Sequence, residues 1–236
     1  MFDVNEIGVL YNLDYIGKNK DSYVWDEKQR DNPDALAKVT FVFKGGTIGY
    51  LKSDLLKKMQ CAYRGDSTIM LNFRRICDGL LFLDRGNDHY FVVLEVKSGF
   101  GDVKKKAIGQ IPASYVKAKS ILHDFLSYNK SNYKEFGLIV SYPHVTYSPF
   151  DSENNPIIME HKRKIIEDKS EIITSKYNDL LLNQQSAVFL GSDFEFNKLT
   201  QVNSDLFFDK LIVKHCPVAN KCIQATVDLD KIISTL

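Results

Sequence analysis

The chain has 236 residues, 44% of them hydrophobic and 26% charged, and a formal net charge of +1. A globular chain of this length buries a sizeable core and needs no disulfides for stability. No stretch approaches the roughly 20 apolar residues of a membrane span, the start of the chain lacks the pattern of a signal peptide, and the four cysteines are irregularly spaced. We therefore expect a soluble, cytoplasmic protein without a membrane partner.

The first part of the chain is expected to form strands and one short helix. Lys38–Lys44 is rich in β-branched and aromatic residues and predicts a strand, which Gly45-Gly46 would close as a hairpin with Thr47–Leu51. Ser53-Asp54 resembles a helix N-cap, so a helix is expected from there to about Tyr63. Residues 67–73 are expected to form a further strand.

Strands and a helix are also expected in the middle of the chain. Ile76–Leu83 and Tyr90–Val96 are apolar runs separated by a turn, and each predicts a strand. A long helix is expected from Val103 to about Tyr128, with a bend or a break at Pro112, because a proline inside a helix removes a hydrogen bond. Phe136–Ser141 predicts a short buried strand.

This order of elements predicts an α/β fold with a central mixed sheet flanked by helices. Residues 1–52 are expected to pack on a core formed by 53–142. Residues 143–236 are expected to form an α+β C-terminal extension that binds substrate or mediates dimerisation.

Two acidic residues stand out because they interrupt apolar strands. Glu95 lies near the end of the Tyr90–Val96 run, and Asp78 lies within the preceding one. A buried carboxylate is unfavourable unless it is paired or bound to a metal. If the two strands are antiparallel neighbours, both carboxylates meet at one end of the sheet and offer the hard oxygen ligands that Mg²⁺ prefers. Lys97 shares a strand face with Glu95, and the Val96 carbonyl is a further candidate ligand.

The spacing D-x16-E-x-K on consecutive predicted strands resembles the PD-(D/E)XK nuclease superfamily, the restriction-endonuclease-like proteins. The resemblance covers roughly residues 53–142, with Cys77 where the motif has proline. It implies a core of helix, three strands, helix and strand. It also implies a Mg²⁺ ion (for which Mn²⁺ substitutes) held by Asp78 and Glu95, and a water molecule positioned by Lys97.

The helix after the E-x-K strand carries a second point of resemblance. Some branches of the superfamily place a glutamine there, followed by a tyrosine, and the resemblance therefore implies a catalytic role for Gln110. Tyr115 lies one position further along than the usual spacing. Many members also carry a glutamate on the first core helix, and that ligand has no clear counterpart in this chain.

Basic residues flank the candidate site and are expected to contact nucleic-acid phosphates, which supplies affinity rather than sequence preference. The alternative is an ordinary solvated helix face. The candidates are Arg74, Arg75, Lys104, Lys105, Lys106 and Lys117, with Lys119 on the same basic helix.

The function predicted from these residues is a Mg²⁺-dependent endonuclease that hydrolyses phosphodiester bonds, with DNA favoured over RNA and a homodimer expected if both strands are cut. Restriction, repair, mobile-element processing and phage defence all remain open as settings. The alternatives are an RNA nuclease, or a nuclease-derived module that binds nucleic acid or a protein partner without cleavage. His215, Cys216 and Cys222 could supply ligands to zinc, but ordinary buried cysteines explain them more simply.

Overall fold

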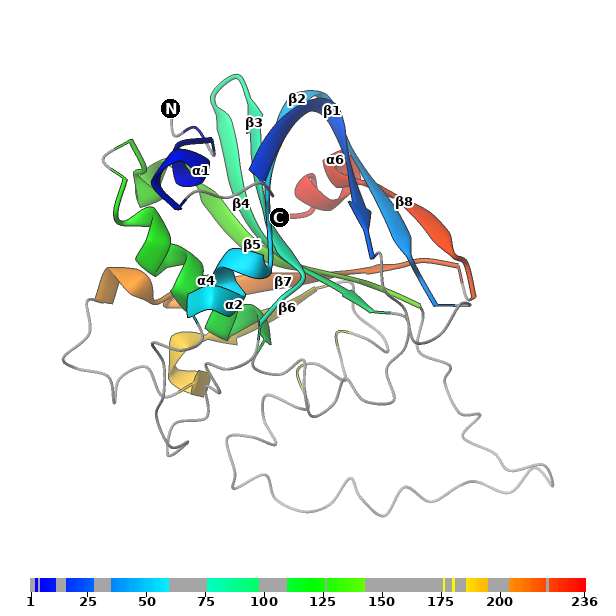
Figure 1. The fold of residues 1–236 in the computed structure, drawn as a ribbon. Helices are drawn as coiled ribbons and strands as arrows, with labels where there is room; N and C mark the ends of the chain where they lie inside the picture. Colours follow the sequence, from blue (N-terminus) through cyan, green and yellow to red (C-terminus); the bar gives the residue numbers. More distant parts are fainter. Residues whose placement is uncertain are drawn as a thin grey trace, which may run out of the picture.

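The chain folds as an α/β protein around one mixed β-sheet of eight strands (Figure 1). The computed structural model describes residues 3, 5–11, 16–27, 35–59, 76–97, 110–125, 127–142, 176, 180, 186–194, 204–219 and 221–236. The predicted strand at 67–73 and the linker after Tyr142 lie outside these residues.

The sheet has the strand order β1-β2-β3-β4-β5-β7-β6, with β8 pairing to β2. Strands β1 to β4 and the β6–β7 pair are antiparallel, whereas β4, β5 and β7 run parallel, as do β2 and β8. The strands are β1 Ile16–Asp26, β2 Lys38–Lys52, β3 Gly79–Arg85, β4 Asp88–Lys97, β5 Lys134–Ser141, β6 Ser186–Leu190, β7 Lys210–Pro217 and β8 Gln224–Asp228.

The predicted hairpin at Gly45-Gly46 is wrong, because β2 continues through both glycines as one strand. Gly45 has a φ of 70°, a left-handed conformation that a glycine adopts without strain and that lets the strand bend without reversing. Both halves of β2 pair with β1, which shifts register between Lys20 and Ser22 opposite the bend.

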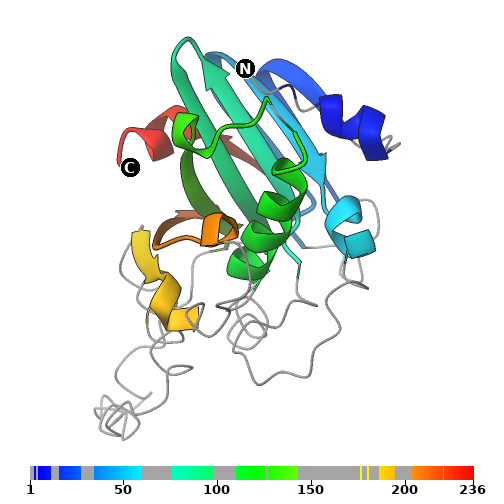
Figure 2. The ribbon, with the colours of Figure 1, turned by 90° about the vertical axis from the view of Figure 1, so that its left-hand side faces the viewer.

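The helices cover both faces of the sheet. Helices α1, α2 and α4 lie on one face and α6 on the other (Figures 1 and 2). No helix in the described part of the chain is both long and apolar enough to cross a membrane. The helical elements are α1 Asn5–Tyr11, α2 Asp54–Met59, α4 Gln110–Leu122 and α6 Leu229–Ile233, with 3₁₀ turns η3 Lys130–Asn132, η5 Gly191–Phe194 and η7 Ser204–Leu206.

Two predicted helices are found, each with a shorter described extent. Helix α2 begins at Asp54, directly after Ser53, as predicted. The described part of helix α4 runs from Gln110 to Leu122, with Pro112 near its start, and it ends before the predicted limit at about Tyr128. The predicted stretches from 60 to 63 and from 103 to 109 lie outside the described residues.

A hydrophobic core fills each face of the sheet. One core contains Phe91 and Val93 of β4 together with residues from α1, α2 and α4. The other contains Val92, Leu94 and Val96, together with Leu229 of α6. Because β4 is covered on both faces, its middle residues from Tyr90 to Leu94 form an unbroken apolar run.

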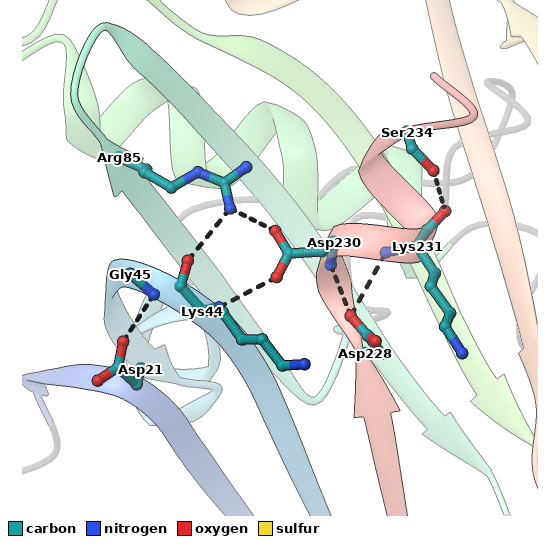
Figure 3. A network of polar contacts seen from close by, with 8 residues as sticks. All are labelled: Asp21, Lys44, Gly45, Arg85, Asp228, Asp230, Lys231 and Ser234. Atoms are coloured by element: carbon teal, nitrogen blue, oxygen red, sulfur yellow. Dashed lines mark hydrogen bonds and ion pairs between the residues drawn. The ribbon is translucent and has the colours of Figure 1, made fainter.

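The C-terminal part of the chain belongs to the same sheet as the rest. Strand β7 lies beside β5, and β8 lies beside the first half of β2. Figure 3 shows how α6 is fixed there: Asp230 accepts hydrogen bonds from the Arg85 guanidinium at 2.5 Å and from the Lys44 amide at 3.0 Å. The side chain of Asp228 caps the start of the helix.

Candidate functional site

The acidic residues singled out in the sequence meet where β3 begins and β4 ends. Asp78 immediately precedes β3, and its amide donates to the Leu94 carbonyl of β4 at 2.9 Å. In return, the Val96 amide donates to Asp78 Oδ2 at 2.7 Å. The first bond joins the backbone of Asp78 to β4, and the second holds the Asp78 carboxylate against the backbone of β4 next to Glu95.

Lys97 completes a group of three charged side chains. Its Nζ lies 2.6 Å from Glu95 Oε1 and 3.8 Å from Asp78 Oδ2. Residues 93, 95 and 97 share one face of β4 because strand side chains alternate, whereas the Val96 side chain is buried in the core of the opposite face. The structure therefore brings Asp78, Glu95 and Lys97 together, as the strand pairing predicts.

The site contains buried acceptor atoms that the protein does not satisfy. Glu95 is 1% exposed. Within the described part of the chain, the only buried side-chain N or O atoms without a hydrogen-bond partner are both carboxylate oxygens of Glu95 and Gln110 Oε1. The Lys97 ammonium lies 2.6 Å from Oε1 of Glu95 and is the ion-pair partner of that oxygen. Such orphaned acceptors point to a missing cation or donor.

Burial and charge shift the pKa of each member of the group. The pKa of Glu95 is raised to about 8, because burial and the Asp78 charge raise it by more than Lys97 lowers it. Burial also raises the pKa of Asp78, against the lowering effects of Lys97 and the Val96 amide. Burial lowers the pKa of Lys97, but Glu95 and Asp78 outweigh it and the net shift is upward. The three groups therefore titrate as a coupled set.

Helix α4 contacts the segment that leads into Asp78. Gln110 Nε2 donates to the Ile76 carbonyl at 2.8 Å, and the Cys77 amide donates to Ser114 Oγ at 2.8 Å. These two helix residues are four positions apart and share a face. Gln110 therefore contacts the segment that precedes Asp78.

Comparisons with protein-family models, curated proteins and solved structures find no match to this chain. What the site can do therefore follows from its own chemistry. Two carboxylates with unsatisfied oxygens are the donors that Mg²⁺ or Mn²⁺ prefers, and Mg²⁺ keeps several waters when it binds only one or two carboxylates. No group of three or more His, Cys, Asp or Glu side chains suited to a metal occurs among the described residues, so such an ion would rest on Asp78 and Glu95 with backbone, water or substrate oxygens.

The predicted phosphate contact from Lys117 is wrong for this conformation, because the side chain of Lys117 is 0% exposed. Its burial lowers its pKa to about 8. Lys119 is also fully buried and its ammonium binds Glu135 at 2.7 Å. Tyr115 donates its hydroxyl proton to Glu135 rather than approaching Glu95. Arg74, Arg75, Lys104, Lys105 and Lys106 lie outside the described residues.

One polar pair beside the site escaped the sequence analysis. Ser141 of β5 is the register partner of Lys97, and its hydroxyl lies 2.8 Å from Nε2 of His215 on β7. Both residues are buried. The signal in the sequence that could have identified this pair is Ser141, a polar residue at the end of an otherwise apolar strand.

The alternative zinc set is not assembled in the part of the chain that the structure describes. His215 faces Ser141, whereas Cys216 and Cys222 pack against the hydrophobic core of the opposite face. Consecutive strand residues point to opposite faces, which separates His215 from Cys216. The interpretation as ordinary cysteines fits this arrangement.

Proposed function

We propose that the protein is a metal-dependent nuclease that hydrolyses phosphodiester bonds, with DNA as the favoured substrate. The observation that carries the proposal is the convergence of Asp78, Glu95 and Lys97 within ion-pair distance at one end of β4. Glu95 is almost completely buried, and apart from the Lys97 ion pair no hydrogen-bond partner satisfies its carboxylate oxygens, which favours a bound cation as a further partner.

The order of elements around the site supports a restriction-endonuclease-like core. Strands β2, β3 and β4 form an antiparallel series, α4 follows, and β5 returns parallel to β4. The PD-(D/E)XK resemblance implies a helix followed by three strands, with the acidic residue at the second strand and E-x-K on the third. In this chain α2 instead lies between β2 and β3. In this arrangement β2 takes the place that the sequence analysis gave to residues 67–73.

Asp78 and Glu95 would hold the Mg²⁺ or Mn²⁺ ion, with the Val96 carbonyl as a third candidate donor. When bound, such an ion polarises the scissile phosphate and lowers the pKa of a coordinated water. Asp78 is kept in place by the Val96 amide. The Lys97 ammonium, held beside both carboxylates, orients the attacking water and stabilises the negative charge that develops on the phosphate.

Gln110 contributes to the same site from α4. Its Nε2 is occupied by the Ile76 carbonyl, which leaves its buried Oε1 as an acceptor. An amide oxygen in this position accepts a hydrogen bond from a water molecule at the reaction centre. Cutting of both DNA strands would require two copies of the site, which favours a homodimer.

The test is a cleavage assay of the purified chain on plasmid DNA, linear DNA and RNA, with Mg²⁺ and with a chelator. We expect Mg²⁺-dependent cleavage of DNA, and a loss of at least about 100-fold in rate for Glu95→Ala and Lys97→Ala. Lys134→Ala is the matched control, because that lysine forms an exposed ion pair with Asp88 at the other end of β4 and β5. Full activity in both site variants would refute the assignment. Cleavage of RNA alone would change the substrate, and the absence of any cleavage would favour a binding module.

A further inference from the structure

The segment that leads into Asp78 is held by a helix rather than by a strand. The β3–β4 ladder starts at Gly79, which pairs with Leu94, and the β2–β3 ladder ends at the same glycine. In the residues before Gly79, the Cys77 amide donates to Ser114 and the Ile76 carbonyl accepts from Gln110, both on α4. Helix α4 therefore takes the place that a neighbouring strand would otherwise have.

Ser114 is the better placed of the two helix residues to control the Asp78 carboxylate. Its hydroxyl binds the backbone of the residue next to Asp78, at 2.8 Å, and it is completely buried. The Asp78 amide is bonded on the other side to Leu94 of β4. The backbone of residues 77 and 78 is thus bonded from α4 and from β4, which leaves the carboxylate little freedom to move.

We propose that Ser114 is a positioning residue, which sets the distance between the Asp78 and Glu95 carboxylates by fixing the Cys77 amide. This inference rests on the proposed function. Mg²⁺ tolerates little variation in ligand distance, so displacement of one carboxylate lowers the affinity of the site for the ion. Residues that orient metal ligands are typically worth 10- to 100-fold in metal affinity.

The test compares Ser114→Ala with Ser120→Ala in the full chain. Ser120 is a matched control, because it is on the same helix and its hydroxyl donates to the Val116 carbonyl within that helix. The probe is Mn²⁺ alone, titrated into each protein by calorimetry at a temperature where circular dichroism shows the protein folded. Amide exchange at Cys77 is followed separately and reports the hydrogen bond directly.

We expect Ser114→Ala to bind Mn²⁺ at least about tenfold more weakly and to exchange the Cys77 amide faster, whereas Ser120→Ala matches the wild type. If the alanine variant does not fold, Ser114→Cys supplies the comparison, since its thiol has a similar shape and is a weak acceptor. Faster exchange at Cys77 with unchanged Mn²⁺ affinity would overturn the positioning role alone. A wild-type chain that neither binds Mn²⁺ nor cleaves would instead overturn the proposed function.

Discussion

At the scale of single residues, Glu95 has the most unfavourable position in the described structure. Its carboxyl group is almost completely buried and lies beside the carboxyl group of Asp78. The Lys97 ammonium is the charge that favours its ionised form. An unpaired charge there would be strongly destabilising, so the metal-free protein keeps this group protonated to about pH 8. A divalent ion has to displace that proton, which makes its binding weaker at lower pH.

The raised pKa of Glu95 predicts how the stability of the metal-free protein depends on pH. The folded state holds a proton on Glu95 up to about pH 8, from a reference value of 4.5, so stability should fall as pH rises through this range. The neutral His215, whose pKa burial lowers from 6.5 to about 4, acts in the opposite direction only below pH 6.5.

Between pH 6.5 and 8 the folded and unfolded His215 are both neutral, so the slope there comes from the coupled group of Glu95, Asp78 and Lys97. Urea unfolding with chelator present should show a loss of up to about 1.4 kcal/mol per pH unit in the wild type. Glu95→Gln has no such proton to lose and should give a flatter profile. Equal slopes for the two proteins would show that Glu95 is ionised in the folded state.

Residue patterns predicted the group of three charged side chains but not the burial of Lys117 and Lys119. Asp78, Glu95 and Lys97 were identifiable because charges in apolar strands are unusual. Lys117 and Lys119 lie on a helix, and a helical pattern does not reveal which face will be covered by other parts of the chain. Both are fully buried, which no local signal in the sequence indicated.

At the scale of elements, the C-terminal half of α4 is joined to β5 by a buried polar network. The Lys119 ammonium binds Glu135 at 2.7 Å and the Tyr128 hydroxyl at 2.6 Å, and Tyr115 also donates to Glu135. Glu135 of β5 is thus paired with one charged side chain of α4 and hydrogen-bonded by a second. This network fixes the far end of the helix whose first turns contact the residues before Asp78.

Removing the ammonium group of this network should destabilise the protein. Lys119→Met leaves the Glu135 charge with only tyrosine donors, and we expect a loss of about 3 kcal/mol in the free energy of unfolding. Lys134→Met is the control, because the Lys134–Asp88 pair is exposed, and it should cost less than about 1 kcal/mol. Urea unfolding at pH 7 measures both. A similar small loss in the two variants would contradict a stabilising role for the network.

The elements were predictable where local signals were strong and unpredictable where the sheet decided the outcome. The strands around Glu95 and Ile139 follow from their apolar runs. At Gly45-Gly46 the local pattern favoured a hairpin, but pairing with β1 on both sides of the bend holds β2 as one strand. A glycine pair is compatible with either outcome, so only the tertiary pairing distinguishes them.

At the scale of the whole molecule, one sheet is built from segments far apart in the chain. Strand β8 lies beside β2, and α6 places Leu229 in the same hydrophobic core as β4. The sequence suggested a C-terminal α+β extension, and nothing in its local patterns indicated which strands β7 and β8 would join. Non-local pairing of this kind is set by the whole chain rather than by any one segment.

This shared core predicts that a C-terminal substitution destabilises the entire fold. Leu229 is 0% exposed, so Leu229→Ala should cost about 2 to 5 kcal/mol and shift a single unfolding transition seen by both circular dichroism and fluorescence. Leu236→Ala, at a residue 39% exposed, is the control and should change stability by less than about 0.5 kcal/mol. Two separate transitions would instead indicate that the C-terminal part unfolds independently.

The central claim is that Asp78 and Glu95 together bind a divalent ion beside Lys97. Calorimetric titration of Mn²⁺ into the wild type, Asp78→Asn and Glu95→Gln tests it most directly, since neither substitution changes the side-chain size appreciably. We expect the wild type to bind Mn²⁺ and each variant to lose that binding or to bind at least about tenfold more weakly. Mn²⁺ binding that is equally strong in all three proteins would contradict it.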